Sequence, residues 1–478
     1  MATDKRWLAA FPIVLILCAG AGAVFAEGPE QRLAAERAGF ERAGLEMPAM
    51  SVAEGASAPT TQTLGIVRLA DRILVQGDTP AGEAGAIVSL NAPFTNSLGQ
   101  VGCTGDLDVA NANDRFVWLD EAVIWHNEDG LPAVLGGAES TMGVGDAGQF
   151  VYSPSVDGDD AVWSHNGAVL VAGDPAPGFP GGVTNIFNSR PTMNADGRAY
   201  WVAGFNDAGG TSTLGRVLYT SATAAAGDVQ VVLRSDDLID GLAIDRPSGI
   251  DFDYDFSEDH AHRILGLLLD TGSTANDAAV GVDSTLVARE GSPSGASDNW
   301  ANFDSVSING AGHYLFSGDT DGAAATDEFI AYDGAIVLRE GDSVDAQTLT
   351  SPAEVVALSI DEGGSAVHLW SAAGATELLF FACDGADPGD GTLILATGDG
   401  LDYDGDVVAD ATVVDFNASS PVGPGLELST AGPIYVHLDI DEGSGSRMAI
   451  VSLPRPPCMP FLDGFESSDT GRWSSTVP

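Results

Sequence analysis

The 478-residue sequence predicts an all-β fold, a seven-bladed β-propeller built from repeats of about 50 residues. Three observations lead to this prediction. A turn motif followed by an alternating apolar strand recurs, a second strand-and-turn motif alternates with it, and the composition includes 60 Gly and 24 Pro. Gly at this frequency without a collagen-like period indicates many tight turns.

The first motif is a four-residue turn that mostly ends in Gly. Asn, Asp and Ser side chains bond to the local backbone, and Gly tolerates a positive φ. Apolar residues two and four positions later, as in Phe150 and Tyr152, are typical of a strand with one buried face. In one copy His260 replaces Gly, so we expect a looser turn or another type there. The copies are Asn96–Gly99, Gly145–Gly148, Asn194–Gly197, Ser257–His260, Asn309–Gly312, Asp361–Gly364 and Ser429–Gly432.

The second motif is an apolar strand that ends in Gly-Asp or a similar turn. Its clearest copies are Ile73–Asp78 and Val169–Asp174. Two motifs that alternate seven times favour blades of four strands over a solenoid, whose period is usually shorter. Separate sandwich domains would need about 100 residues each. The other copies are Ala133–Gly137, Val231–Asp236, Leu286–Gly291, Ile336–Asp342 and Leu393–Asp399.

The chain is predicted to have four parts. Residues 1–26 resemble a secretory signal peptide, because Lys5 and Arg6 precede an apolar run and a small residue stands before the expected cleavage site. Residues 27–63 form an N-terminal extension and linker, 64–453 the propeller, and 454–478 a Pro-rich break and C-terminal tail. We therefore expect a secreted or cell-surface protein. No later segment has the about 20 apolar residues of a membrane helix.

The charge of the chain excludes some classes of partner. The formal net charge is -50, and Lys5, the only Lys, lies in the expected signal peptide. Such a surface repels phosphate backbones, so nucleic acid is excluded as a partner, and anionic membranes are disfavoured. Divalent cations are natural counter-ions, although a solvated acidic surface is the simpler interpretation. We expect a monomer that binds an extracellular ligand not specified by the sequence.

Three cysteines remain after the expected cleavage: Cys103, Cys383 and Cys458. An exported protein can form disulfides, but an odd number leaves at least one thiol unpaired within the chain. Cys383 lies among Asp and Gly in an expected loop, and Cys458 follows the last repeat. We therefore predict that these two pair, and that Cys103 is buried on a strand.

The two repeated motifs together resemble a known family. Asn194–Trp201, Asn309–Phe316 and Gly173–Gly178 are similar to the tandem-repeat proteins named for an NxxGxxxAF motif, which are exported bacterial proteins with a variable C-terminal anchor. The resemblance covers residues 65–453, but the Ala-Phe ending is poorly kept. It implies a propeller-like repeat architecture and export. It implies no activity and no catalytic residues.

Motifs that would indicate catalysis are absent from the sequence. There is no His-Glu-x-x-His, no P-loop and no Gly-x-Ser-x-Gly elbow, and Gly291–Gly295 has Pro at the position of the nucleophile. His260, His262 and His368 lack metal-ligand spacing, so we expect structural histidines with satisfied hydrogen bonds.

Closely spaced carboxylates suggest one metal site. Alternate Asp residues across a Gly-bearing turn can direct several oxygen ligands at one ion, as Ca²⁺ requires. The pattern departs from an EF-hand because Gly405 precedes the third Asp and no Glu closes the loop, so a solvated acidic turn is the alternative. Asp251–Asp255 is a weaker candidate, because alternating Asp residues at a strand edge would point into solvent. The predicted calcium ligands are Asp402, Asp404, Asp406 and Asp410.

Two functions are consistent with these observations. The first is a non-catalytic surface or extracellular binding or scaffold protein, because propeller loops around a central channel are common recognition sites. The second is a hydrolase or lyase acting on extracellular polymers. A cluster of His, Arg, Tyr and carboxylates converging on the channel would favour the enzyme.

Overall fold

The computed structural model describes residues 66–458, except 110–113, 127–134, 157–158, 186–189, 208, 210–212, 247–248, 375, 418–425 and 431. All of these residues belong to the unit Gln62–Pro478. The predicted signal peptide, N-terminal extension and C-terminal tail beyond Cys458 lie outside the described residues. No described helix is long and apolar enough to span a membrane.

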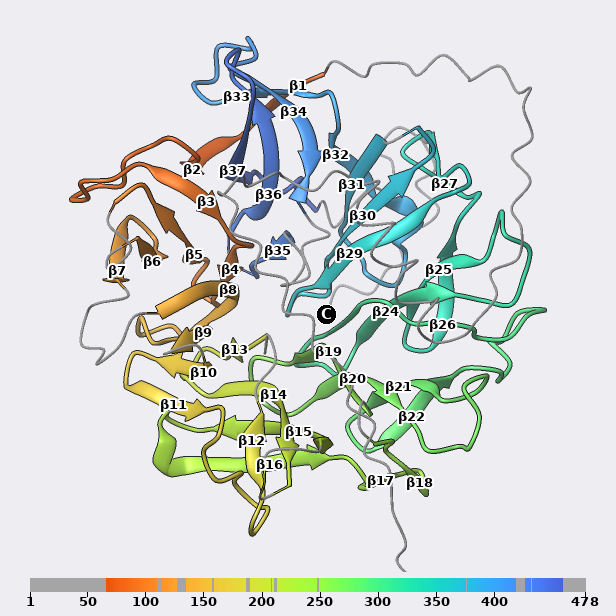
Figure 1. The fold of residues 1–478 in the computed structure, drawn as a ribbon. Coiled ribbons are helices and arrows are strands. Elements are labelled where there is room, and N and C mark those ends of the chain that lie inside the picture. Colours follow the sequence, from red (N-terminus) through yellow and green to blue (C-terminus); the bar gives the residue numbers. More distant parts are fainter. Residues whose placement is uncertain are drawn as a thin grey trace, which may run out of the picture. The chain divides into compact units, whose positions relative to one another are not determined.

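The described chain is built almost entirely from β-strands, as predicted. Six sheets are each formed by one continuous stretch of chain, and we call them blades 1 to 6 (Figure 1). Most of their strands pair with their neighbours in antiparallel register, in the up-and-down order typical of a propeller blade. Two single-turn 3-10 helices, Ala226–Asp228 and Pro388–Asp390, complete the regular structure of the described part.

The first three blades span residues 87–234. In blades 1 and 3 a short additional strand, β4 or β13, continues the inner edge of the sheet. The strands of blade 1 are β3 (Ile87–Leu90), β4 (Phe94–Thr95), β5 (Val101–Leu107), β6 (Arg115–Leu119) and β7 (Ala122–His126); those of blade 2 are β8 (Leu135–Val144), β9 (Phe150–Val156), β10 (Asp159–Ser164) and β11 (Gly167–Val171); those of blade 3 are β12 (Val183–Asn185), β13 (Thr192–Met193), β14 (Ala199–Asn206), β15 (Thr213–Ser221) and β16 (Val229–Arg234).

The next three blades have four strands each, and two small hairpins follow blades 3 and 5. The strands of blade 4 are β19 (Ile250–Phe256), β20 (Arg263–Leu268), β21 (Ala278–Val282) and β22 (Thr285–Arg289); those of blade 5 are β23 (Val306–Ile308), β24 (Tyr314–Asp319), β25 (Glu328–Tyr332) and β26 (Ala335–Arg339); those of blade 6 are β29 (Glu354–Ile360), β30 (Ala366–Ala372), β31 (Thr376–Ala382) and β32 (Thr392–Ala396); the hairpins are β17 (Leu238–Ile239) with β18 (Leu242–Ala243) and β27 (Ser343–Val344) with β28 (Gln347–Thr348).

A further sheet, here called the closing sheet, combines strands from both ends of the described chain. β2 pairs antiparallel with β37, and β1 pairs parallel with β33. The prediction of seven alike repeats is therefore corrected to six continuous blades and one composite sheet in the described chain. Its strands are β1 (Val67–Leu69), β2 (Asp71–Val75), β33 (Gly400–Asp402), β34 (Ala411–Phe416), β35 (Leu426–Leu428), β36 (Ile434–Asp441) and β37 (Ser446–Leu453).

Hydrophobic clusters lie between each pair of successive sheets. In β24, Leu315 belongs to the cluster between blades 5 and 6, whereas its neighbour Phe316 belongs to the cluster between blades 4 and 5. Another cluster joins Leu74 and Ile450 of the closing sheet to Ile87 of blade 1. The sequence predicted one buried face per strand, but both faces of the central strands are buried because each blade packs between two others.

The second predicted motif ends the outermost strand of several blades. After β11, Gly173 adopts a φ of +90° and its N–H donates to Thr184 O at 2.8 Å, in the strand that begins blade 3. Gly341 and Gly398 adopt φ values of +90° and +91° after β26 and β32. The weak copy Ala133–Gly137 does not end an outermost strand. Its described residues begin β8, which within its blade pairs only with β9 and lies at the opposite edge of the sheet from β11.

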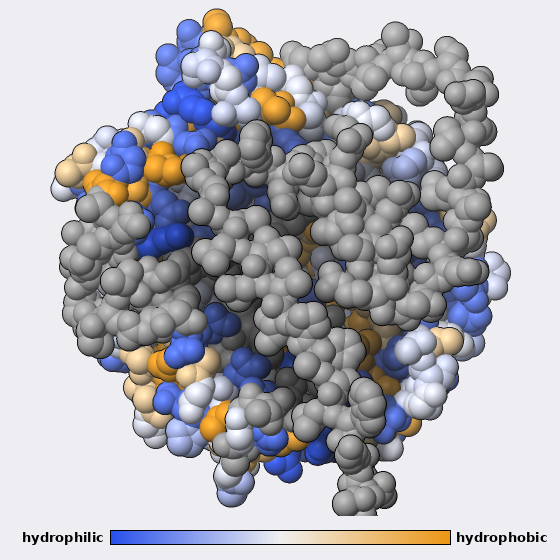
Figure 2. Space-filling view, viewed as in Figure 1, coloured by the Kyte–Doolittle hydropathy of each residue, from blue (hydrophilic) through white to orange (hydrophobic). Residues whose placement is uncertain are grey.

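The surface carries both hydrophilic and hydrophobic residues. On the described parts of one face, hydrophilic residues are interspersed with single hydrophobic ones (Figure 2). The exposed large hydrophobic side chains include Leu98, Leu238, Val407 and Val408. Scattered residues of this kind are normal on soluble proteins.

Candidate functional site

The first predicted motif forms a set of closely similar turns, which we number 1 to 7 in chain order. In turns 1 to 6 the N–H of the fourth residue donates to the carbonyl of the first, with N···O distances from 2.9 to 3.0 Å. The fourth residue has a positive φ in each of these turns, from +62° to +86°. Asn309 shows the expected side-chain role, because its Oδ1 accepts the N–H groups of Ala311 and His313.

His260 leaves the type of turn 4 unchanged, and the hairpin is one residue longer, which agrees with the expected looser turn. It adopts the same left-handed conformation as the glycines, with a φ of +62°, and its N–H bonds to Ser257 O at 3.0 Å. Its Nε2 lies 2.9 Å from Asp196 Oδ2, and its Nδ1 contacts Asn194 and Tyr200. Side-chain contacts therefore hold a non-glycine residue in this conformation. Turn 4 differs from turns 1 to 3, 5 and 6 in its length. The N–H of its first residue, Ser257, bonds to His262 O, one residue farther along the chain than the equivalent bond in those turns.

Neighbouring turns are joined by hydrogen bonds between them. Asn96 Nδ2 donates to Gly145 O at 3.3 Å, and Asn194 Nδ2 and Asn309 Nδ2 make the equivalent bonds to Ser257 O and Asp361 O at 2.5 and 3.2 Å. The first turn residue therefore has a second role, in which it binds the next turn. This role was not predicted from the sequence, which identified only the local bonds.

The remaining turns are joined by other groups. Asp146 N–H donates to Ala195 O at 2.9 Å and links turns 2 and 3. The Glu362 carboxylate of turn 6 accepts the N–H of Glu258 in turn 4 at 3.1 Å and the N–H of Gly310 in turn 5 at 2.6 Å. Glu362 N–H in turn donates to Thr430 Oγ1 of turn 7 at 3.2 Å.

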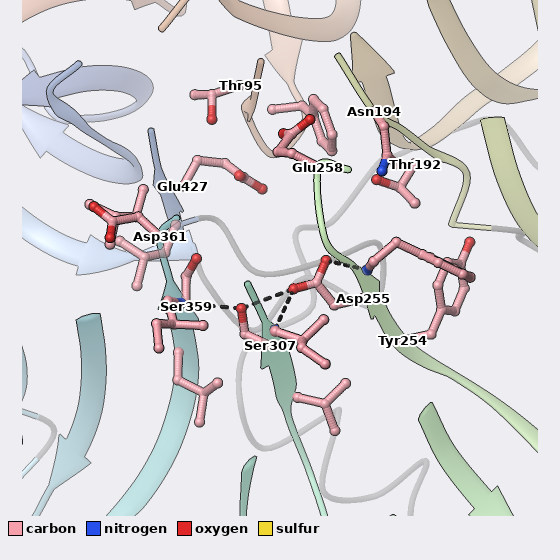
Figure 3. Close-up of a pocket in the computed structure, with 18 of the residues that line it drawn as sticks. Thr95, Thr192, Asn194, Tyr254, Asp255, Glu258, Ser307, Ser359, Asp361 and Glu427 are labelled. Atoms are coloured by element: carbon pink, nitrogen blue, oxygen red, sulfur yellow. Dashed lines mark hydrogen bonds between the residues drawn. The ribbon is translucent and has the colours of Figure 1, made fainter. Parts of the chain in front are cut away.

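A pocket lies among the turns and the innermost strands that precede them (Figure 3). Its volume is about 210 Å³, and blades 1, 3, 4, 5 and 6 and the closing sheet all contribute to it. We call it the channel pocket. The charged residues that line it are Arg190, Asp253, Asp255, Glu258, Asp361, Glu362 and Glu427.

Asp255, at the end of β19, is the best-bonded carboxylate of the channel pocket. Its Oδ2 accepts Ser307 Oγ–H at 3.0 Å and Ile308 N–H at 2.9 Å (Figure 3). Ser307 Oγ in turn accepts Ile360 N–H at 3.1 Å, so one chain of bonds joins blades 4, 5 and 6. The sequence predicted that Asp251–Asp255 would point into solvent, and for Asp255 this is wrong.

Burial raises the pKa of two channel carboxyl groups. The pKa of Asp255 rises to about 6, although its hydrogen-bond donors act to lower it. Burial likewise raises the pKa of Glu258 to about 7; Ala195 N–H, which donates to its Oε2 at 2.8 Å, opposes the change, whereas the negative charge of Glu362 adds to it. Both groups therefore carry protons more readily than ordinary carboxylates.

Glu427, on β35 of the closing sheet, differs from the other channel carboxylates. Its carboxylate has no hydrogen bond or ion pair within the described part of the chain, and it points into the pocket (Figure 3). Burial raises its pKa well above the usual range, and the negative charges of Asp255 and Glu258 raise it further. A carboxylate in this setting lacks a partner that would stabilise its charged form.

Arginine and tyrosine also converge on the channel pocket. Arg190 Nη1 lies 2.8 Å from Asp253 Oδ1, and the hydroxyl of Tyr254 donates to Arg190 O. Arg455, which is not among the lining residues, pairs through its guanidinium with the carboxylate of Asp361, which is. The described lining residues include no histidine. The cluster proposed to distinguish an enzyme is therefore present in part.

The predicted calcium ligands are brought together in part. Asp402, Asp404 and Asp410 each place one carboxylate oxygen so that the three atoms lie within 4.8 Å of one another. Asp406 is not a member of this group, and its Oδ1 accepts Val408 N–H at 2.8 Å.

Backbone hydrogen bonds shape the same loop. Desolvation acts to raise the pKa of Asp402, but hydrogen bonds from the N–H groups of Val407, Gly405 and Asp404 outweigh it and lower the pKa. Val407 adopts a φ of +69°, which is uncommon for a β-branched residue. The ionised form of Asp402 is thus favoured, as a cation ligand requires.

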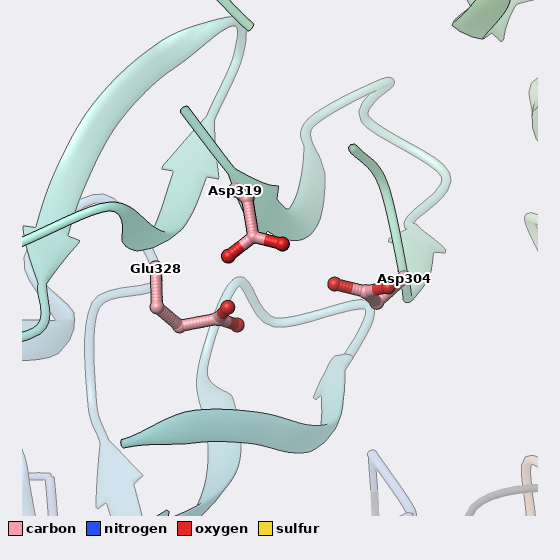
Figure 4. Close-up of side chains that lie close together, drawn as sticks. All are labelled: Asp304, Asp319 and Glu328. Carbon is pink, nitrogen blue, oxygen red and sulfur yellow. The ribbon is translucent and has the colours of Figure 1, made fainter. Parts of the chain in front are cut away.

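A second group of carboxylates was not predicted from the sequence. Asp304, Asp319 and Glu328 also place oxygens within 4.8 Å of one another, in blade 5 (Figure 4). Glu328 Oε1 accepts Val355 N–H of blade 6 at 2.9 Å. Burial raises the pKa of Glu328 to about 10 and that of Asp304 to about 6, so a protonated Glu328 can share its proton with a neighbouring carboxylate. The wide spacing of these residues along the chain gave no signal in the sequence.

The histidines singled out in the sequence are bonded, as expected. His262 Nδ1 lies 3.1 Å from Asp283 Oδ2. His368 is buried and accepts a hydrogen bond from Trp370 Nε1 at 2.9 Å. His437 is different, because it is buried and neither ring nitrogen has a partner in the described residues.

The cysteine prediction is confirmed. Cys383 and Cys458 form a disulfide with Cα atoms 5.4 Å apart, and Cys103 is a buried free thiol on β5.

The comparisons with known proteins show low similarity to several solved structures. The Dos1 propeller is 9% identical, with a TM-score of 0.37 over 80% of this chain and 95% of that chain. Prolyl oligopeptidase B from Galerina marginata is 12% identical, with a TM-score of 0.40 over 73% of this chain and 47% of that chain. A gluconolactonase from Xanthomonas campestris is 13% identical, with a TM-score of 0.30 over 67% of this chain and 98% of that chain.

No protein-family model matches the chain, and no curated protein matches it in sequence. The structural similarities are too low to transfer an activity, a ligand or a partner. The resemblance to NxxGxxxAF-repeat proteins therefore stays a prediction, and the propeller fold rests on the strand order and packing of this chain itself.

Proposed function

We propose that this protein is an exported, non-catalytic binding protein, secreted or displayed at the cell surface, whose ligand site is the channel pocket. Glu427 is the observation that carries the proposal, because its partly buried carboxyl group points into the pocket and has no partner among the described residues, so it is available to a ligand. The export part of the proposal rests on the basic and apolar segment of residues 1–26.

The closing sheet is proposed to be the seventh blade of a closed ring. Support comes from the hydrophobic cluster that joins it to blade 1 and from the one that joins it to blade 6. Closure matters for function because β35, which carries Glu427, belongs to this sheet.

The ligand that best fits the channel pocket is a small organic cation, such as the ammonium group of an amine. Glu427, Asp255 and Glu258 surround the space with oxygen atoms, and each group becomes a negatively charged acceptor when it loses its proton. Within the described residues these carboxylates do not form a group tight enough to hold a metal ion. An ammonium group reaches separated acceptors through several N–H donors.

Isothermal titration calorimetry with propylamine tests this function. The wild-type protein is expected to bind one propylamine, and Glu427→Gln is expected to weaken binding about tenfold or more, because a charged acceptor becomes neutral. Glu121→Gln, which changes an exposed residue in blade 1, is the control for the change in net charge. Equal affinity in Glu427→Gln and the wild type would refute the site.

An enzyme of the hydrolase or lyase class is the second candidate. Glu258 favours it, because a carboxyl group with a pKa near 7 in a pocket with several other carboxyl groups resembles a general acid. Turnover of extracellular polysaccharides that is lost in Glu258→Gln would support catalysis. Binding without turnover would support the first proposal.

We also propose that the loop Asp402–Asp410 binds Ca²⁺. The convergence of Asp402, Asp404 and Asp410 supports it, since hard oxygen ligands suit this ion. The role would be structural, because the loop connects β33 to β34 in the closing sheet.

A further inference from the structure

The segment Pro454–Cys458, here called the strap, leaves the closing sheet after β37 and is fastened to blade 6. Its last residue, Cys458, forms the disulfide with Cys383, which directly follows β31. The strap therefore bridges two neighbouring sheets at a point fixed by a covalent bond.

Arg455 makes three contacts from the middle of the strap. Its Nη1 donates to Thr430 O of turn 7 at 3.0 Å, and its Nη2 pairs with Asp361 Oδ2 of turn 6. Its guanidinium carbon lies 5.3 Å from the centre of the Phe381 ring on β31. A planar guanidinium that bonds two groups and stacks on a ring is held in one orientation.

The Asp361 side chain that Arg455 neutralises is only 2% exposed and lines the channel pocket. Its other oxygen, Oδ1, accepts Ser365 N–H at 2.8 Å. Asp361 directly follows β29, the innermost strand next to β35, which carries Glu427. Figure 3 shows both carboxylates among the pocket side chains. Without Arg455, two uncompensated carboxylates would therefore line neighbouring parts of the pocket.

We propose that Arg455 is a specificity-determining residue of the channel pocket. By pairing with Asp361, it removes from the pocket one of the carboxylates near Glu427 that a second positive charge could pair with, so the site prefers a ligand with one positive charge over a ligand with two. The Cys383–Cys458 disulfide keeps Arg455 in place. This inference rests on the proposed cation-binding function.

The test compares the affinities of propylamine and 1,4-diaminobutane for the wild type and for Arg455→Gln. We expect Arg455→Gln to bind the diamine about five- to tenfold more tightly than the wild type, with a much smaller change for propylamine. Arg72→Gln is the matched control, since Arg72 also pairs with two carboxylates, Asp78 and Glu442, but outside the pocket. Arg455→Lys, which keeps the charge, should retain the wild-type preference.

The outcomes separate the two proposals. If the wild type binds neither amine, the channel function fails. If the wild type binds propylamine and Arg455→Gln leaves the ratio of the two affinities unchanged, the role of Arg455 fails while the channel function stands. If Arg455→Gln does not fold, the double variant Cys383→Ser, Cys458→Ser replaces it. That variant should shift the ratio toward the diamine, and an unchanged ratio would overturn the inference.

Discussion

The hydroxyl group of Tyr435 donates a hydrogen bond to the carbonyl oxygen of Gly99 at 2.9 Å, although the two residues are 336 positions apart in the chain. Tyr435 lies on β36 of the closing sheet, and Gly99 ends turn 1 in blade 1. The bond therefore joins the last part of the repeat region to the first and helps to hold the set of turns together.

Loss of this bond should lower stability by the value of one hydrogen bond. Tyr435→Phe is expected to reduce the free energy of unfolding by about 1 kcal/mol, measured by urea denaturation. Tyr314→Phe is the control, because the Tyr314 hydroxyl makes no hydrogen bond within the described residues. An equal effect of both variants would show that Tyr435 makes no special contribution to closure.

The left-handed residue of each turn gives a second prediction. Gly364 has a φ of +84° and open space where a Cβ would lie, so Gly364→Ala should cost only the backbone strain of about 1 kcal/mol. Gly227→Ala, at a site with equal space and no positive φ, should leave stability unchanged or slightly raised. The difference in melting temperature between the two variants measures the strain. No difference would contradict the assigned turn geometry.

Glu328 predicts a specific dependence of stability on pH. Its pKa is raised from 4.5 to about 10 in the folded chain, so the folded state binds the proton more tightly than the unfolded state. The contribution of protonated Glu328 to the free energy of unfolding is complete below pH 4.5 and is lost as the pH rises toward 10. Glu328→Gln, which resembles the protonated side chain, should flatten this loss in melting curves between pH 5 and 9. A variant with the wild-type pH profile would show that Glu328 is ionised when folded.

The predicted calcium site can be tested through stability. Millimolar CaCl₂ is expected to raise the melting temperature of the wild type and to have no effect on Asp404→Asn, because the variant removes one ligand charge. Asp406→Asn, outside the converging group, is the matched control and should keep the calcium response. The same calcium response in Asp404→Asn and the wild type, or no response in either, would leave the solvated acidic turn as the correct interpretation.

Local features of this fold could be predicted from the sequence, because turn chemistry and strand periodicity are local properties. The turns at Asn194 and Asn309 are examples. The pairing of Cys383 with Cys458, which are 75 residues apart, could be predicted for another reason, because only three cysteines were available and Cys103 was expected to be buried on a strand. The composite closing sheet was not predicted, because β2 and β37 pair across almost the whole repeat region. Their pairing depends on how the blades pack, which the spacing of motifs does not encode.

The candidate site was predictable to a smaller extent. The sequence pointed to Asp402, Asp404 and Asp410 because they are close along the chain. It gave no signal for Glu427, since its neighbours Asp255 and Glu258 come from blade 4 and are distant in sequence. A site assembled from several blades becomes visible only when the blades are packed together.

The pH dependence of propylamine affinity is the most direct test of the central claim, that Glu427 binds a cation in the channel pocket. Burial and neighbouring negative charge raise the Glu427 pKa well above its usual range, so binding of a cation must displace a proton. The affinity of the wild type should therefore rise with pH, with release of about one proton per amine bound, while the amine itself stays protonated. Glu427→Gln should show weak binding without this dependence. Binding to the wild type that does not change with pH, or the same pH profile in Glu427→Gln, would contradict the account.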